Sequence, residues 1–72
     1  MKMFMDRAKV EMMKKLYKKG ERIVCDFMDD PQGVPSGTEG TITSVDDIGQ
    51  IHVDWDNGST LALTEIDKFH KI

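Results

Sequence analysis

The spacing of apolar side chains changes from a helical period to a strand period at Gly20. Over residues 3–19 the apolar positions fall on one broad stripe at about 100° per residue, which predicts an amphipathic helix. Lysines crowd the last turn, where cations suit the helix dipole, and Gly20 can take the left-handed position that ends a helix. We therefore predict a basic amphipathic helix within residues 1–19. Its apolar stripe consists of Phe4, Met5, Ala8, Met12 and Leu16.

Beyond Gly20 apolar and polar residues alternate, which is the pattern of strands with one buried face. Strands are predicted for RIVCDFM (22–28), TITSV (41–45), QIHVDW (50–55) and STLALT (59–64). A proline- and glycine-rich loop anchored by Val34 follows the first strand, and EIDKF predicts a helical turn before an extended end. This pattern describes a small, strongly bent antiparallel barrel of four or five strands over residues 20–72. The predicted inward set is Ile23, Cys25, Phe27, Ile42, Ile51, Val53, Leu61 and Leu63, with Ile66 and Phe69 closing one end.

The apolar pattern also selects one hairpin register in the second half of the chain. A two-residue loop at Asn57 and Gly58 would set apolar residues of one strand against polar residues of the next. A three-residue loop over residues 56–58 instead sets Ile51 opposite Leu63. In such a loop the glycine takes a positive φ. We therefore predict that Gly58 is left-handed.

Four aspartates and one histidine within residues 45–63 raise the question of a cation site. A four-residue turn over residues 46–49 would pair Val45 with Gln50. The two aspartates in this turn are then explained as turn-forming residues. His52, Asp54 and Asp56 alternate along one strand, so they share a face and could converge on a metal ion or act in acid–base chemistry. We prefer the interpretation of a solvated sheet face, because that is what alternation normally produces. We predict no metal, no cofactor and no catalytic residue, hence a protein that is not an enzyme.

Most of the chain resembles a family known as domain of unknown function 4314, found in bacteria and their phages. The resemblance is carried by KGERIV, by DDPQGVPSGTEGTITS and by VDDIGQIHVDWDNGS, and it runs from Lys19 to about Phe69. GTEGTITSVDD is more distantly similar to the glycine-anchored strand pair of KOW-type and other SH3-like barrels. The resemblance implies an SH3-like barrel and no known activity. The predicted N-terminal helix precedes these residues and therefore lies outside the resemblance.

Charge divides the chain into a basic segment and an acidic body. Residues 1–22 carry eight Lys and Arg against three Asp and Glu, a net charge of +5, and residues 23–72 carry two against ten, a net charge of −8. Cys25 is the single cysteine, so no disulfide can form within the chain, which suits a reducing cytoplasm. No apolar run approaches the roughly 18 residues of a membrane span. A cytoplasmic protein without membrane contact is therefore expected.

These features favour a protein-binding module that uses the acidic surface of an SH3-like barrel, since such barrels present loops and grooves to peptides. One alternative is a nucleic-acid-associated protein that binds through the basic helix, because phosphate requires positive potential. Another is an acidic phage protein that imitates DNA and occupies a host protein. The helix stripe is predicted to be buried against this barrel or a second copy, so a homo-oligomer is a further expectation. The candidate binding residues are Asp29, Asp30, Asp46, Asp47, Trp55, Lys14 and Lys18.

Overall fold

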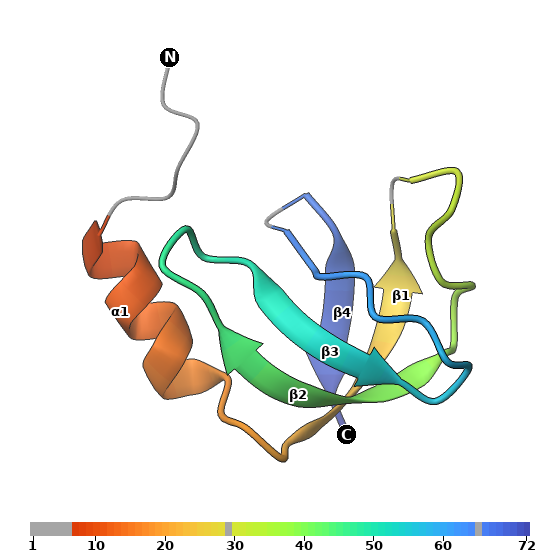
Figure 1. Cartoon of the computed structure of the whole chain (residues 1–72), viewed down its shortest axis with the longest axis horizontal. Helices are drawn as coiled ribbons and strands as arrows, with labels where there is room; N and C mark the ends of the chain where they lie inside the picture. The colour runs from red at the N-terminus through yellow and green to blue at the C-terminus, as the bar shows by residue number, and fades with distance from the viewer. Residues whose placement is uncertain (1–6, 29, 65) are drawn as a thin grey trace.

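One helix and four antiparallel strands are the regular elements of the residues that the structure describes, as the change of period at Gly20 predicts (Figure 1). The computed structural model describes residues 7–28, 30–64 and 66–72. Helix α1 begins at Arg7 and ends at Leu16. The strands are β1 (Arg22–Phe27), β2 (Glu39–Val45), β3 (Ile51–Trp55) and β4 (Lys68–Lys71). The predicted mainly β fold with an N-terminal helix is confirmed.

The four strands form one sheet in the order β3-β2-β1-β4, and the sheet curves around the core (Figure 1). The predicted strand 59–64 is wrong in its extent. It returns along β3 and forms a ladder pair only at Leu63, whose amide donates to the carbonyl of Ile51 over 2.8 Å. The last strand of the sheet is β4, which begins within the segment EIDKF predicted as a helical turn and continues into the end predicted to be extended. The result is a barrel-like sheet.

The hairpin after β3 has the predicted three-residue loop. Ile51 pairs with Leu63, and the amide of Trp55 donates to the carbonyl of Ser59 over 3.0 Å. Both contacts belong to the register with residues 56–58 in the loop, and Gly58 has a φ of 92°. The predicted register of this hairpin is therefore confirmed.

Replacing Gly58 by alanine should lower the free energy of unfolding by about 1 kcal/mol, because an L side chain is strained in the left-handed region. No atom lies within 4 Å of the site of the new Cβ, so the cost is conformational and not steric. Urea denaturation measures it. Gly58→Asn is the control, since asparagine tolerates this region and should lose less. Equal stability of the alanine variant and the natural chain would contradict the loop geometry.

The hairpin between β2 and β3 has Ile42 paired with Val53, as the predicted register requires, but it departs from that register by one residue nearer the turn. Val45 pairs with Ile51 and not with Gln50, because the ladder shifts between Ile42 and Ser44. Such a bulge places two residues of one strand opposite one of the other and bends the strand. The end of β2 lies beside α1 (Figure 1).

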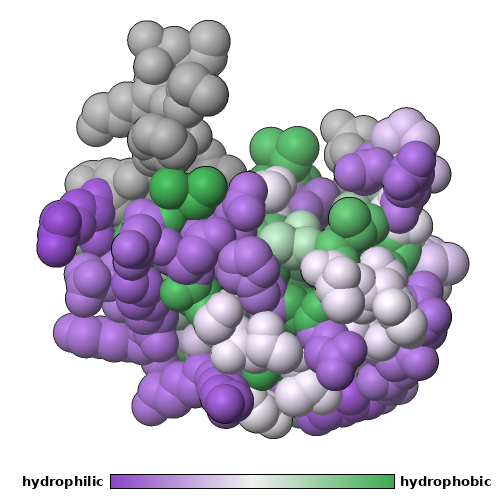
Figure 2. Space-filling view, viewed as in Figure 1, coloured by the Kyte–Doolittle hydropathy of each residue, from purple (hydrophilic) through white to green (hydrophobic). Residues whose placement is uncertain are grey.

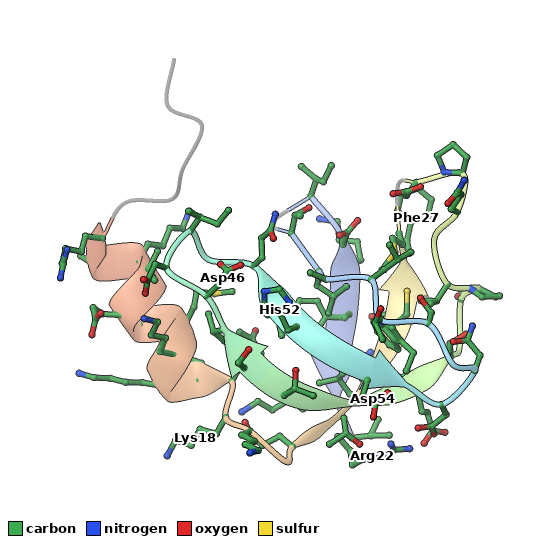
Figure 3. The ribbon with its side chains drawn as sticks, in the orientation of Figure 1. Lys18, Arg22, Phe27, Asp46, His52 and Asp54 are labelled. Carbon is green, nitrogen blue, oxygen red and sulfur yellow. The ribbon has the colours of Figure 1, made fainter. Side chains whose placement is uncertain are left out.

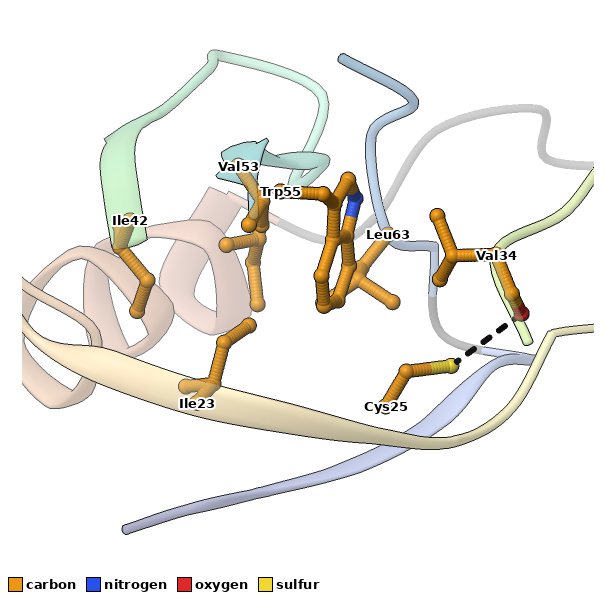
Figure 4. Packing of buried hydrophobic residues seen from close by; sticks show 8 residues of the cluster. Ile23, Cys25, Val34, Ile42, Val53, Trp55 and Leu63 are labelled. Carbon is orange, nitrogen blue, oxygen red and sulfur yellow. Dashed lines mark hydrogen bonds between the residues drawn. The ribbon is translucent and has the colours of Figure 1, made fainter. Parts of the chain in front are cut away.

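The core fills the concave side of the sheet (Figure 4). Trp55 is its largest member, with 2% of its surface exposed, and its indole Nε1 donates to the carbonyl of Leu61 over 2.9 Å. Phe27 was predicted to point inward but is 55% exposed, because the pairing of β1 with β4 shifts between Cys25 and Phe27. Leu61 is only half-buried. The buried cluster consists of Ile23, Cys25, Val34, Ile42, Ile51, Val53, Trp55 and Leu63.

Helix α1 packs on the sheet through a different face from the predicted one. Val10 is 3% exposed, and Met13 and Tyr17 pack against the core. Met12 and Leu16, from the predicted stripe, are 60% and 49% exposed, so the prediction that they lie against this barrel is wrong. The other stripe residues Phe4 and Met5 lie outside the described residues, and Ala8 is exposed.

Gly20 does not cap α1, which ends four residues earlier. Its φ is 93°, and its amide donates to the carbonyl of Ile42 over 2.8 Å. Gly20 therefore makes the bend by which the chain enters β1.

Candidate functional site

A shallow groove opens at the end of the sheet where β1 finishes and β4 begins. Its volume is about 190 Å³. Figure 2 shows apolar side chains exposed at this end of the molecule, whereas the surface visible over α1 is mostly polar. The groove is lined by Met28, Asp30, Leu61, Ala62, Thr64, Ile66 and Asp67.

The first wall of the groove follows from the irregular end of β1. The register shift after Cys25 turns Phe27 outward beside Met28, which is half-buried (Figure 3). The loop after β1 is held in place by Val34, which is buried as predicted. Gly33 lets that loop lie close to Met28, because a Cβ at this position would come within 2.9 Å of the Met28 side chain. This wall is formed by Met28 and Asp30.

The second wall is the segment between the β3 hairpin and β4. Leu61 and Ala62 are half-buried, and Ile66 is 62% exposed. The carboxylate of Asp67 accepts hydrogen bonds from the amide and the hydroxyl of Thr64, over 2.9 and 3.2 Å. The turn predicted for EIDKF is shorter than expected, because β4 begins at Lys68, and Ile66 lies at the surface within it.

The rim of the groove is acidic. Asp30 is exposed, and one of its oxygens accepts from the amide of Gln32 over 2.8 Å, which fixes the side chain in its loop. Asp67 is half-buried on the opposite wall. None of the described residues that line the groove is cationic. Apolar side chains thus lie between two carboxylates.

Two of the predicted binding residues are paired with each other. Nζ of Lys14 on α1 lies 2.8 Å from Oδ1 of Asp47 in the turn between β2 and β3. The hydrogen bond to Asp47 raises the pKa of Lys14, and the same contact lowers the pKa of Asp47. This pair and the burial of Val10 hold α1 against the end of β2.

Asp46, another predicted binding residue, organises the same turn. It accepts hydrogen bonds from the amides of Ile48 and Gln50 and from Nε2 of His52, the last over 2.8 Å. Burial raises the pKa of Asp46, but the bonds from His52, Gln50 and Ile48 outweigh it and leave the pKa below its ordinary value. Asp46 therefore stabilises the hairpin.

The remaining predicted residues are scattered. Trp55, expected at a binding surface, is core, because it shares the inward parity of Ile51 and Val53. Lys18 is exposed next to the end of α1, and Asp29 lies outside the described residues. Among the predicted binding residues that the structure describes, Asp30 alone lines the groove. The apolar lining residues were missed, namely Met28, Leu61, Ala62 and Ile66.

The three polar residues that share a face of the β3 region do not form one site. His52 contacts Asp46, and Asp56 forms a bidentate pair with Arg22 at 2.9 and 2.6 Å, while Asp54 is exposed. The contact with Arg22 lowers the pKa of Asp56. In the described part of the chain, no three His, Cys, Asp or Glu side chains gather closely enough to hold a metal ion.

Cys25 is a buried core residue, as its inward position predicts. Its Sγ lies 3.9 Å from the carbonyl oxygen of Val34 (Figure 4). Burial raises the pKa of the thiol, which leaves it protonated and unreactive near neutral pH.

The chain belongs to the family described as domain of unknown function (DUF4314), whose sequence profile matches residues 6–72. The match includes α1, so the helix is part of the family's domain, contrary to the boundary at Lys19 drawn from the resemblance. No curated protein and no solved structure matches the chain significantly. No helix in residues 7–28, 30–64 and 66–72 is long and apolar enough to cross a membrane.

Proposed function

We propose that this protein is a small, non-enzymatic protein-binding module that holds a partner segment in the groove between Met28 and Ile66. The observation that carries the proposal is the combination of exposed apolar side chains with an acidic rim. Phe27 and Ile66 are 55% and 62% exposed at the same end of the sheet. Asp30 and Asp67 stand on opposite walls of the groove. Apolar surface rimmed by polar residues is typical of an interaction site.

The chemistry of the groove defines its partner. An apolar side chain of the partner would displace water from Met28, Leu61 and Ile66, and a neighbouring lysine or arginine would meet the carboxylates of Asp30 and Asp67. Charge complementarity of this kind speeds encounter and sets specificity. We therefore propose a partner segment in which a large apolar residue stands beside a cation. We further propose that the barrel is SH3-like and that the protein comes from bacteria or phages, as the resemblance implies.

Selection of short random peptides on the immobilised chain tests this function. The selected peptides should be enriched in Lys or Arg next to Leu, Ile, Met or an aromatic residue. Their affinity should fall when salt is raised from about 50 to 500 mM, since exposed charges are screened. Ile66→Lys should weaken them by at least about tenfold, because it removes an apolar anchor and adds a repelling charge.

Ile72→Lys is the matched control for this experiment. Ile72 has the same exposed fraction as Ile66, 62%, but does not line the groove. The control should bind the selected peptides as the natural chain does. Peptides without a preference for cations, or binding that Ile66→Lys leaves intact, would contradict the proposed function.

Nucleic-acid binding through the helix is a weaker candidate. Lys15, Lys18 and Lys19 are exposed, which favours contact with phosphate. Lys14, however, is held by Asp47 and is less available. Binding of a DNA or RNA duplex that Ile66→Lys leaves unchanged, and that substitution of Lys15 and Lys18 abolishes, would favour this candidate over the groove.

A further inference from the structure

The outer face of α1 has a chemistry opposite to that of the groove. Met12 and Leu16 are 60% and 49% exposed, on the side of the helix away from buried Val10. Lys15, which lies between these two residues in the sequence, is also exposed. Glu11, the acidic residue of α1, stands one turn before Lys15 at the edge of this side, where it also lines a pocket beside Asp47. The outer face, defined as Met12, Lys15 and Leu16, therefore combines apolar side chains with a cation.

This face matches the partner described for the groove, yet the two surfaces of one chain cannot meet. Helix α1 is fixed at the end of β2 by Val10 and by the pair of Lys14 with Asp47. The groove lies at the end of β1, and α1 lies at the opposite end of the molecule (Figures 1 and 3). Contact between the two surfaces requires a second copy of the chain.

We propose that the outer face of α1 docks into the groove of another copy of this chain. Met12 and Leu16 would cover Leu61 and Ile66, and Lys15 would meet the rim carboxylates. The inference rests on the proposed function of the groove and names its partner. The contact joins two different surfaces, so each added chain leaves one helix face and one groove unoccupied and assembly continues head to tail. A single helix face on a shallow groove is a small interface, so assembly should be weak and dependent on concentration.

Sedimentation equilibrium of the whole chain is the first test. The average mass should rise with concentration up to about 1 mM chain and fall toward the monomer as salt is added. Ile66→Lys should be monomeric over this range, and so should the double variant Met12→Gln with Leu16→Gln. Both variants change exposed side chains and should stay folded. Ile72→Lys should assemble like the natural chain. A natural chain that stays monomeric at about 1 mM would overturn the proposal.

Mixing the two monomeric variants tests the geometry. The Ile66→Lys chain keeps its helix face and the Met12→Gln, Leu16→Gln chain keeps its groove, so one productive contact remains. The mixture should form a one-to-one dimer and nothing larger. A symmetric contact between two helices would instead leave Ile66→Lys as a dimer on its own, which would overturn the head-to-tail arrangement.

Peptide binding in the groove and self-association of the chain can be tested separately. The Met12→Gln, Leu16→Gln chain has an intact groove and should bind the selected basic peptides. If it does so while the natural chain remains monomeric, the inference on the second copy fails and the proposed function stands. If neither peptides nor a second copy bind, both fail.

Discussion

Replacing Trp55 by alanine is expected to lower the free energy of unfolding by about 3–5 kcal/mol. The indole is the largest fully buried side chain and its Nε1 donates to Leu61. A chain of 72 residues has a total stability of about 4–11 kcal/mol. The change therefore removes much of the stability, and the melting temperature followed by circular dichroism should fall by at least about 12 °C.

Trp55→Phe separates packing from the hydrogen bond. Phenylalanine keeps most of the buried ring but leaves the carbonyl of Leu61 without its donor, so the loss should be clearly smaller than for alanine. The natural chain has a single tryptophan, so its fluorescence reports this residue alone. Emission typical of a water-exposed indole in the folded protein, or a melting temperature unchanged by Trp55→Ala, would contradict the position of Trp55 in the core.

The buried position of Trp55 can be predicted from the sequence. Ile51, Val53 and Trp55 stand two residues apart, so strict alternation places all three on one face. Trp55 was nevertheless predicted to bind a partner. The structure shows that alternation was the better guide, since all three side chains are buried.

The groove could not be predicted in the same way. Its first wall depends on the register shift between Cys25 and Phe27, which turns Phe27 outward where alternation places it inward. A bulge is a property of the pairing between two strands and has no signature within one strand. Its second wall brings Ile66 close to Met28 across a long interval of sequence, which only the folded chain reveals.

The helix was predicted correctly as an element and wrongly as a packing surface. Its sequence carries two apolar faces, and the predicted stripe is the longer of them. At about 100° per residue Lys15 falls within that face, so burying it would remove a charge from water at high cost. The face with Val10, Met13 and Tyr17 avoids this cost. It also brings Tyr17 to 5.2 Å from Phe69, measured between ring centroids.

The second large effect is expected at Gly40, where β2 passes beneath Trp55. A Cβ on Gly40 would lie 2.6 Å from Cγ1 of Val53 and 2.8 Å from Cε3 of Trp55. Both neighbours are buried, so neither can move without disturbing the core. Overpacking of this kind costs about 1–3 kcal/mol. Gly40→Ala should therefore lower the stability measured by urea denaturation more than Gly58→Ala does, although both add one methyl group.

A double-mutant cycle with Val53→Ala tests whether the cost at Gly40 is steric. Val53→Ala removes the methyl group nearest to the new Cβ, so Gly40→Ala should cost less in that background than in the natural chain. A coupling energy of about 1 kcal/mol is expected for residues in direct contact. Gly40 is not among the glycines with positive φ, so an alanine there carries none of the conformational strain that acts at Gly58. Additive effects of the two substitutions would mean that β2 and β3 do not approach each other as closely as Gly40 allows.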